Sequence, residues 1–341
     1  MGHQYLAIGW NRQKRLYDLY LLGFVALYLV SFIYFSLLIS PDITFETLLI
    51  RSTGSLAIIM LHVILLIGPL CRLFPRLLPL LYNRRHLGVS MALLASIHGG
   101  FSIIQFHSQG NTGPLESFFT TNTAFESFAQ FPFMIPGFFA LLIILLMAAT
   151  SHDFWLNLLS ARLWKALHML VYVAYLLLLV HVLTGSYQQN HAPELLLFLG
   201  LGALAIISLH LVAGWKEAPA DKANTAQQDW LQACHVDDIP EKRAKIIRVG
   251  GDRVAIFRYD NKLAATSNVC QHQNGPLGEG CVIDGLITCP WHGYQYQPED
   301  GCSPPPFTEK VATYHIKVTE GMVYINQHAE APGTPVEPVT F

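Results

Sequence analysis

Six long apolar segments place the strongest constraint on how this chain can fold. Each is long enough to cross the roughly 30 Å hydrocarbon core of a bilayer as a helix. Charged residues make up only 13% of the 341 residues, against about a quarter in ordinary soluble proteins. Because the shortage lies in the first two thirds of the chain, we predict a six-helix membrane bundle followed by a small soluble domain. The segments lie near residues 17–40, 54–74, 86–107, 132–150, 163–185 and 194–215.

The distribution of Lys and Arg between the loops predicts the orientation of this bundle. The loops at 107–131 and 185–194 contain neither residue. Cytoplasmic loops are enriched in Lys and Arg, so the loops that carry them are expected in the cytoplasm together with both termini. An even number of crossings gives the same answer. The basic residues behind this expectation are Arg12, Lys14, Arg15, Arg72, Arg76, Arg84, Arg85, Arg162, Lys165 and Lys216.

Beyond residue 229 the sequence changes to short alternating runs typical of β-strands. The runs are at 245–249, 253–258, 262–267, 311–318 and 322–326, and the pairs Gly250-Gly251, Asp260-Asn261 and Glu320-Gly321 are typical hairpin turns. We therefore expect a small antiparallel all-β domain. The predicted organisation is an N-terminal tail at 1–16, the membrane domain at 17–215, a polar linker at 216–229, the β domain at 230–328 and a C-terminal tail at 329–341.

Four residues of this β domain combine thiols and imidazoles in a pattern typical of a metal centre. They form the motifs Cys270-x-His272 and Cys289-x-x-His292. Two cysteines and two histidines match a [2Fe–2S] cluster in which the cysteines bind one iron and the histidines the other. A zinc site also uses two Cys and two His, but zinc motifs rarely pair these two spacings. We therefore favour the iron–sulfur cluster.

The segment around these motifs resembles a Rieske domain of the ferredoxin type. The Rieske proteins of quinol-oxidising complexes carry one extra cysteine in each ligand loop, joined as a disulfide, and this chain has Gly275 and Trp291 there. Tyr294 replaces their hydrogen-bonding serine. Fewer hydrogen bonds to the sulfurs imply a potential near the lower end of the range of about −150 to +300 mV. The resemblance therefore implies a cytoplasmic reductase or ferredoxin-like protein as electron donor.

Three histidines lie within the predicted membrane segments at positions that suit haem. His98 lies in the middle of the third segment, and His168 and His181 both lie on the fifth. His168 and His181 are thirteen residues apart, which is about 19.5 Å along a helix axis and matches the separation that two haems stacked across a bilayer need. In a straight helix, however, the two side chains would point in directions about 140° apart. A bend or an oblique porphyrin is therefore required. The alternative is that these histidines only hydrogen-bond neighbouring helices.

The pattern resembles the ferric reductase-like transmembrane family over residues 45–185. The supporting stretches are Arg51-Ser-Thr-Gly54, Pro69-Leu-Cys-Arg72, Arg84-Arg-His-Leu-Gly88 and the histidines at 168 and 181. The resemblance implies b-type haem, one or two, between the third and fifth helices. His98 and His181 would hold the outer haem, and His168 the inner one with His86 or Arg84 as partner. His62 and His210 are further candidate ligands.

Together these features predict an electron-transfer oxidoreductase in the inner membrane of a bacterium. Electrons from the cytoplasmic donor would pass through the cluster and b-type haem to an acceptor at the outer face. Two alternatives without haem are a membrane-anchored Rieske ferredoxin and a Rieske-type oxygenase component. The latter needs a further iron held by two His and a carboxylate, and few histidines follow His292. A net charge of −2 provides no basic surface for nucleic acid.

Overall fold

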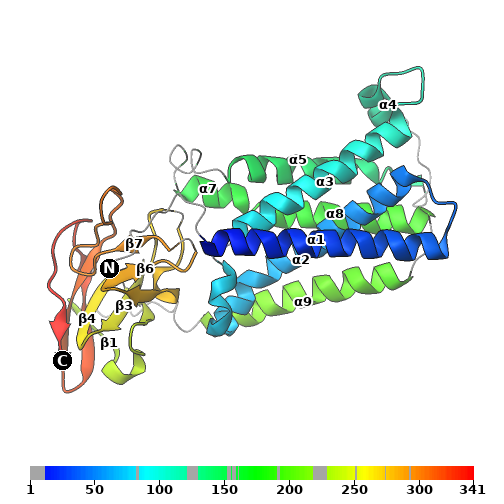
Figure 1. The fold of residues 1–341 in the computed structure, drawn as a ribbon. Helices are drawn as coiled ribbons and strands as arrows, with labels where there is room; N and C mark the ends of the chain where they lie inside the picture. Colours follow the sequence, from blue (N-terminus) through cyan, green and yellow to red (C-terminus); the bar gives the residue numbers. More distant parts are fainter. Residues whose placement is uncertain are drawn as a thin grey trace. The chain divides into compact units, whose positions relative to one another are not determined.

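The structure is a computed structural model, and it describes residues 12–81, 84–120, 130–151, 155, 159, 161–189, 193–217, 229–249, 252–272, 274–291 and 293–341. The predicted cluster ligand His292, the turn Gly250-Gly251 and most of the predicted linker lie outside the described residues. The N-terminal part of the chain is helical and the C-terminal part consists of β-strands (Figure 1). Both predicted types of domain are therefore present.

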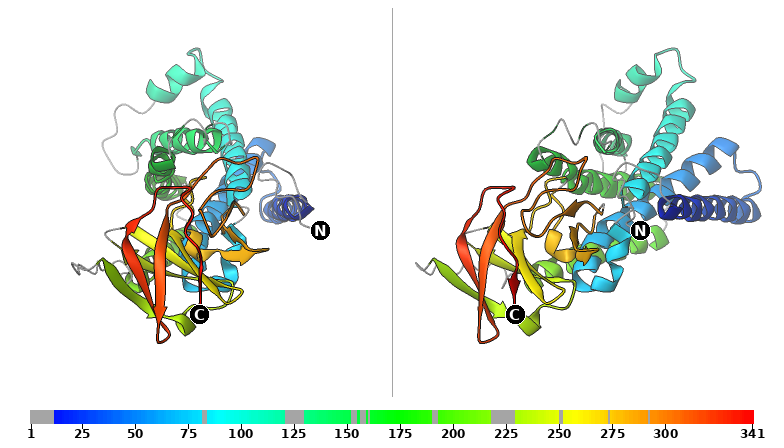
Figure 2. Two further views of the ribbon diagram at one scale, coloured as in Figure 1. Left: turned by 90° about the vertical axis from the view of Figure 1, so that its left-hand side faces the viewer. Right: turned by 60° about the vertical axis from the view of Figure 1, so that its left-hand side comes forward.

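The helical part follows the apolar segments closely. Five of its described helices are long and apolar enough to cross a membrane: Arg15–Ile39, Phe45–Leu73, Arg84–His107, Leu163–Gly185 and Pro193–Lys216. The helices are α1 (Arg12–Ile39), α2 (Phe45–Leu73), α3 (Arg84–His107), α4 (Pro114–Thr120), α5 (Met134–Ala149), α7 (Ala161–His168), α8 (Val171–Gln189) and α9 (Pro193–Glu217), with a 3-10 helix η1 at Pro75–Leu81. Figure 2 shows the short helix α4 at the end of α3.

Two predicted segments differ from expectation. Residues 132–150 are predicted as a full span, but α5 has only 16 residues, or about 24 Å at 1.5 Å per residue. The count of six full spans is therefore not confirmed among the described residues. The fifth segment is interrupted at Met169 and Leu170, so His168 ends α7 while His181 lies on α8. α5 packs against both α3 and α8.

The C-terminal part contains two antiparallel sheets. The larger has the order β1-β9-β8-β4-β3-β2, with β10 paired to β4, and the smaller has the order β5-β6-β7. The strands are β1 (Trp230–His235), β2 (Ala244–Val249), β3 (Asp252–Tyr259), β4 (Lys262–Ser267), β5 (Cys281–Ile283), β6 (Leu286–Thr288), β7 (Gln295–Tyr296), β8 (Thr313–Thr319), β9 (Met322–Ala329) and β10 (Val339–Thr340). The five predicted strands are confirmed, and β1, β5, β6, β7 and β10 were not predicted.

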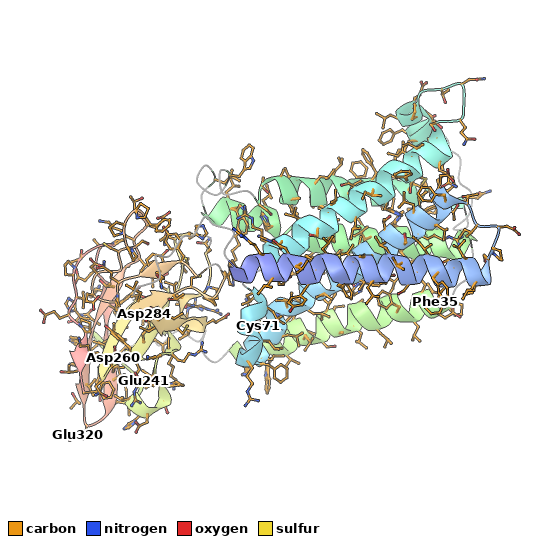
Figure 3. All side chains as sticks on the ribbon, viewed as in Figure 1. Phe35, Cys71, Glu241, Asp260, Asp284 and Glu320 are labelled. Atoms are coloured by element: carbon orange, nitrogen blue, oxygen red, sulfur yellow. The ribbon has the colours of Figure 1, made fainter. Side chains whose placement is uncertain are left out.

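Tight turns fix the register of the hairpins. Asp260 and Asn261 have φ of 45° and 57° between β3 and β4, and Glu320 and Gly321 have φ of 53° and 76° between β8 and β9. Positive φ at both central residues gives the turn whose twist matches that of the flanking strands. Both predicted turns are therefore confirmed, and Figure 3 labels Asp260 and Glu320 at these positions.

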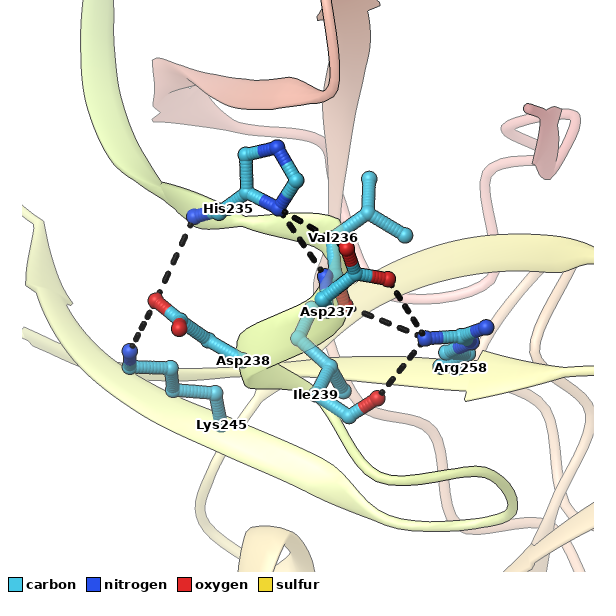
Figure 4. A network of polar contacts seen from close by, with 7 residues as sticks. All are labelled: His235, Val236, Asp237, Asp238, Ile239, Lys245 and Arg258. Atoms are coloured by element: carbon cyan, nitrogen blue, oxygen red, sulfur yellow. Dashed lines mark hydrogen bonds and ion pairs between the residues drawn. The ribbon is translucent and has the colours of Figure 1, made fainter.

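A polar network holds the end of β1 against β2 and β3 (Figure 4). His235 caps the 3-10 turn η3 (Val236–Asp238), and its N–H donates to the carboxylate of Asp238 at 3.4 Å. Lys245 donates to the same carboxylate at 2.8 Å and lowers the pKa of Asp238. Arg258 donates to two backbone carbonyls near the turn, at 3.4 Å each. This turn is therefore held by side chains of both neighbouring strands.

β3 separates two apolar cores. Ile256 packs into one core with residues of β4, β8 and β9. Phe257, the next residue, packs into the other core with Cys270 and Cys289. Successive residues of a strand point to opposite faces, so β3 is buried on both sides. The core that contains Phe257 supports the two predicted cysteine ligands.

Phe257→Ala is expected to destabilise the C-terminal domain by about 3–5 kcal/mol, because it removes a fully buried aromatic ring. The urea midpoint of the domain should fall by at least about 1 M, measured on the full chain by proteolysis and detection of the C-terminus. Ile283→Ala, at a side chain that is 45% exposed, is the control and should leave the midpoint within error. Equal midpoints for both variants would contradict the packing of β3 described above.

Candidate functional site

The two predicted ligand loops have the same backbone hydrogen bonds. In the first, the N–H of Cys270 donates to the carbonyl of Gly275 at 2.9 Å, and the N–H of Asn274 donates to the carbonyl of Cys270 at 2.7 Å. In the second loop, the N–H of Cys289 donates to the carbonyl of Tyr294 at 2.8 Å, and the N–H of Gly293 donates to the carbonyl of Cys289 at 2.9 Å. Each cysteine is therefore fixed at the start of a closed turn.

The two loops face each other closely. Cys270 and Cys289 are only 1% and 2% exposed. A Cβ atom on Gly275 would lie 2.7 Å from Sγ of Cys289 and 3.2 Å from the ring of Trp291. Glycine is therefore required for the second cysteine to approach the first loop. Positions 275 and 291, which carry the disulfide in quinol-oxidising Rieske proteins, are in contact here through the indole of Trp291. All six cysteines lie among the described residues, and none of them forms a disulfide there.

Tyr296 places a hydroxyl beside one of the cysteine sulfurs. It accepts a hydrogen bond from the N–H of Gln271 at 3.0 Å and lies 3.3 Å from Sγ of Cys270. Burial raises the pKa of Tyr296, and the charge of the Cys270 thiolate raises it further. The phenol therefore stays protonated and can donate to the sulfur. The sequence analysis missed this contact, although the alternation of Tyr294 and Tyr296 after the second motif was a signal for it.

Tyr294 holds the predicted ligand His272 in place. Its ring stacks on the imidazole with 4.8 Å between centroids and 11° between planes. Its hydroxyl donates to the carboxylate of Glu309. Burial, and then this hydrogen bond, raise the pKa of Tyr294. Tyr294, which stands where quinol-oxidising Rieske proteins have a serine, thus orients the ring of His272.

In the helical part, the structure brings His98 of α3 and His181 of α8 together. Their ring centroids are 6.1 Å apart and their planes cross at 80°. Two imidazoles that share one metal ion have ring centres roughly 6 Å apart, because each metal–nitrogen bond is about 2 Å long. The two rings are therefore spaced to hold one iron between them.

Each of these histidines is anchored through Nδ1. Nδ1 of His98 lies 2.9 Å from the carbonyl oxygen of Ile50, and Nδ1 of His181 lies 2.7 Å from that of Phe133. A carbonyl can only accept a hydrogen bond, so Nδ1 carries the proton in both rings and Nε2 keeps its lone pair for a metal.

Two glycines make room for this arrangement. A Cβ atom on Gly54 would lie 2.6 Å from Nδ1 of His98, and one on Gly137 would lie 2.6 Å from Nδ1 of His181. The rings therefore lie directly against the backbones of α2 and α5. Neither glycine contact was predicted as such, although Gly54 belongs to a stretch that supported the family resemblance.

The His98–His181 pair lines a cavity of about 540 Å³, a volume in the usual range for ligand sites. Its walls are mostly apolar. The polar lining residues include Arg51, Ser55 and Gln105, and Gly99 also lines the cavity. Among the described residues, Arg51 is the charged residue of this cavity, and a carboxylate-bearing ligand would be a suitable partner for it.

The other two predicted haem ligands lie elsewhere in the helical part. Nδ1 of His168 is 3.0 Å from the carbonyl oxygen of Trp164, and Nε2 is 3.4 Å from Oγ of Ser151. The indole ring of Trp164 stacks on the imidazole of His168, with 3.8 Å between ring centroids. Nδ1 of His86 is 2.6 Å from the carboxylate of Asp18. In both histidines Nδ1 is the anchored nitrogen, and the contact of Nε2 in His168 with Ser151 is long.

His62 differs from these four histidines. Nδ1 is 2.7 Å from the carbonyl of Ile58 and Nε2 is 3.1 Å from the hydroxyl of Tyr175. Both nitrogens are thus used within the protein, and a Cβ atom on Gly202 would lie 2.3 Å from the ring. His62 therefore joins helices and is not a suitable ligand. His210 lies on α9.

Comparison with known families agrees with this geometry. Residues 53–179 match the family described as ferric reductase like transmembrane component, and residues 229–315 match the Rieske [2Fe-2S] domain. Both resemblances found in the sequence are confirmed. A helical membrane module of this kind, followed by an iron–sulfur module, defines a membrane electron-transfer protein.

Through its C-terminal domain, the chain belongs to the Rieske [2Fe–2S] family. Ferredoxin CarAc of Metapseudomonas resinovorans is 31% identical over 100 residues, which cover 29% of this chain and 94% of that protein. The ferredoxin component of the naphthalene 1,2-dioxygenase/salicylate 5-hydroxylase systems of Ralstonia sp is 30% identical over 94 residues, 27% of this chain and 88% of that protein. The ferredoxin subunit of anthranilate 1,2-dioxygenase of Burkholderia cepacia is 31% identical over 101 residues, which cover 29% of this chain and 92% of that protein.

The residues present fit both cofactors that these families imply. Two buried thiols on facing loops, with a fixed imidazole two residues after the first, suit a [2Fe–2S] cluster of mixed ligation. Two imidazoles at the spacing of a shared iron, in an apolar cavity with one guanidinium, suit a b-type haem.

Tyr296→Phe is expected to lower the midpoint potential of the cluster. The hydroxyl donates to a sulfur whose negative charge grows on reduction, so its loss destabilises the reduced state. If this hydrogen bond is about 1.4 kcal/mol stronger in the reduced cluster than in the oxidised one, its loss lowers the one-electron midpoint potential by about 60 mV. An EPR-monitored redox titration measures this, and Tyr314→Phe, at a buried tyrosine of the other core, should leave the potential unchanged. An unchanged potential in Tyr296→Phe would contradict the donation.

Gly54→Ala and Gly137→Ala are each expected to displace one imidazole of the His98–His181 pair, because the new methyl group would lie 2.6 Å from its Nδ1. The optical haem spectrum of the purified protein should lose the signature of two-histidine ligation, or lose haem altogether. Gly88→Ala on α3, where a Cβ atom meets nothing within 4 Å, is the matched control. Normal spectra in both variants would place the haem elsewhere.

Proposed function

We propose that this protein carries electrons across a membrane, from a cytoplasmic donor to an acceptor at the outer face. The C-terminal domain would hold a Rieske [2Fe–2S] cluster and the helical domain b-type haem, and these groups supply the one-electron chemistry when bound. The observation that carries the proposal is the meeting of His98 and His181 in an apolar cavity, within a chain that also contains a Rieske domain.

The proposed cluster ligands are Cys270, His272, Cys289 and His292. The closed turns that begin at the two cysteines fix both thiols, and burial of those thiols keeps water from the cluster. Stacking on Tyr294 fixes the ring of His272.

The proposed ligands of one haem are His98 and His181. The carbonyls of Ile50 and Phe133 hold both imidazoles in the tautomer that binds iron. Arg51 would pair with the carboxylates that haem carries. A second haem would use His168 with His86, and of the two candidate partners Arg84 is the poorer, because a guanidinium stays protonated and has no lone pair to donate.

The proposed topology has six crossings with both termini and the Rieske domain in the cytoplasm of a bacterium. α5 would be the fourth crossing, since a short apolar helix can be accommodated by local thinning of the bilayer. α7 and α8 together would form the fifth. The absence of Lys and Arg from residues 107–131 and 185–194 supports an outer location for those loops.

A second candidate function is that of a membrane-anchored ferredoxin that delivers electrons to a separate oxygenase. The relatives reported above favour it, because all three are named as ferredoxins and two of the names describe ferredoxin components of dioxygenase systems. That function needs no haem, so haem content separates the two candidates.

His98→Ala and His181→Ala are each expected to lose one haem per chain while the EPR signal of the cluster stays at full intensity. The iron and haem contents of the purified protein, measured together, give the result. His210→Ala, on α9, should retain all haem. A wild-type protein without haem, purified from haem-supplemented cells, would leave the anchored ferredoxin as the function.

Transport across the membrane can be measured in liposomes that contain ferricyanide and expose the Rieske domain to the outside. External dithionite is expected to reduce the enclosed ferricyanide through the wild-type protein. His98→Ala liposomes should reduce it no faster than protein-free ones. Equal rates for the wild type and protein-free liposomes would contradict the proposed conduction.

A further inference from the structure

The cavity lined by His98 and His181 carries hydrogen-bonding side chains toward one end. Gln105 follows His98 by seven residues on α3, which is about 10.5 Å along the axis and nearly the same face of the helix. Thr47 precedes Gly54, the α2 residue that lies against His98, by the same number of residues. Nε2 of Gln105 lies 3.3 Å from Oγ1 of Thr47. The two residues therefore meet two turns from His98, near the end of α3 that leads to α4 (Figure 1).

Arg51 adds a positive charge to the same end of the cavity. It precedes Gly54 by three residues, which is about one turn of α2 in the direction of Thr47. In the opposite direction, the residues of α2 and α3 that line the cavity beyond Ser55 are apolar: Ala57, Ile58, Met91 and Ala95. Ser55 itself donates to the carbonyl of Arg51 within its own helix at 2.7 Å. Thr47, Arg51 and Gln105 thus form the polar end of a mostly apolar cavity.

Two groups of the polar end have no partner among the residues that the structure describes. Oε1 of Gln105 is buried and accepts no hydrogen bond from them. The guanidinium of Arg51 forms no hydrogen bond or ion pair with them. A buried polar atom without a partner is costly, and the planar fork of a guanidinium suits a carboxylate. Since Gln105 and Arg51 both line the cavity, both groups are available to a ligand bound there.

The contact with Thr47 allows the amide of Gln105 to turn a donor toward the cavity. Oγ1 of Thr44 donates to Oγ1 of Thr47 at 3.0 Å, so the hydroxyl hydrogen of Thr47 is left for a further bond. If the amide rotates by half a turn, Thr47 donates to Oε1 and the two N–H groups of Nε2 face the cavity. In this orientation Gln105 can donate to a carboxylate while Thr47 holds it in place.

We propose that the polar end binds the two carboxylates of the haem held by His98 and His181, one at the guanidinium of Arg51 and the other at the amide of Gln105. The carboxylates of haem b lie on neighbouring pyrroles at one edge of the porphyrin, which suits two groups on two helices in contact, α2 and α3. The inference rests on the haem ligation proposed above and adds the orientation of the group. Its carboxylate edge faces the end of α3 that leads to α4, and its apolar edge faces Met91.

The competing interpretation is that Gln105 only joins α3 to α2 through Thr47, and that Arg51 only faces water at the mouth of the cavity. In that case the removal of either side chain would affect every porphyrin alike, whatever its charge. A porphyrin with esterified carboxylates separates the two interpretations, because it keeps the apolar ring and loses the negative charges.

The experiment titrates the full chain, purified from haem-limited cells, with haem b and with its dimethyl ester. The absorbance of the bound porphyrin gives a dissociation constant for each compound, and the EPR signal of the cluster gives the amount of intact chain. Arg51→Met and Gln105→Met keep much of the side-chain volume and remove the hydrogen-bonding groups. Ser102→Ala is the matched control, because Ser102 lines the cavity between His98 and Gln105 and its hydroxyl donates to the carbonyl of His98 at 2.7 Å.

The ratio of the two dissociation constants is the result to compare, because effects common to both compounds cancel in it. The wild type should bind haem b more tightly than the ester. This preference should fall about fivefold, or by about 1 kcal/mol, in Arg51→Met and in Gln105→Met, because charge-assisted hydrogen bonds are stronger than neutral ones. Gln105→Glu, which adds a negative charge, should lower it further, and Ser102→Ala should leave it unchanged.

The inference and the proposed function fail in different ways. An unchanged preference in Gln105→Met, or an equal loss of both compounds in that variant, would overturn the role of Gln105, and the same results in Arg51→Met would overturn that of Arg51. If the wild type binds neither compound, or if His98→Ala binds haem b as tightly as the wild type, then the His98–His181 pair is not a haem site and the proposed function fails as well.

Discussion

The hydrogen bond from a histidine nitrogen to a neighbouring oxygen is the interaction on which the helical domain depends. An imidazole in an apolar bundle has two polar nitrogens, and each needs a partner. In His98 and His181 a backbone carbonyl satisfies one nitrogen, and both residues line the cavity. The two glycines are part of the same constraint, because they let each ring lie against the carbonyl it needs. The site proposed for haem is thus determined by backbone positions as much as by side chains.

The C-terminal domain satisfies a similar requirement differently. Its two cysteines are held by turns that close on themselves, and the core around Phe257 supports both turns. Tyr294, directly before β7, and Tyr296, on β7, then reach back to a histidine and to a sulfur. In each domain, therefore, the proposed ligands come from one set of elements and are oriented by another.

Much of the fold could be predicted because its signals are local. The apolar segments gave α1, α2, α3 and α9, and alternation with turn pairs gave β3, β4, β8 and β9. The meeting of His98 and His181 followed from the order of the helices. The rest depended on contacts between distant residues. Neither the break after His168 nor the contact of Asp18 with His86 can be recognised from spacing alone, because packing determines both. The alternation of Tyr294 and Tyr296 was a signal, but packing alone places the hydroxyl of Tyr296 beside Cys270.

The contact between Gly275 and Trp291 has a consequence for how the protein is made. Relatives that bridge these positions covalently must oxidise two thiols at some stage of maturation. Here Gly275 and Trp291 meet without a covalent bridge, and the six cysteines form no disulfide in the structure. Closure of these two loops therefore does not require the oxidation of a thiol pair.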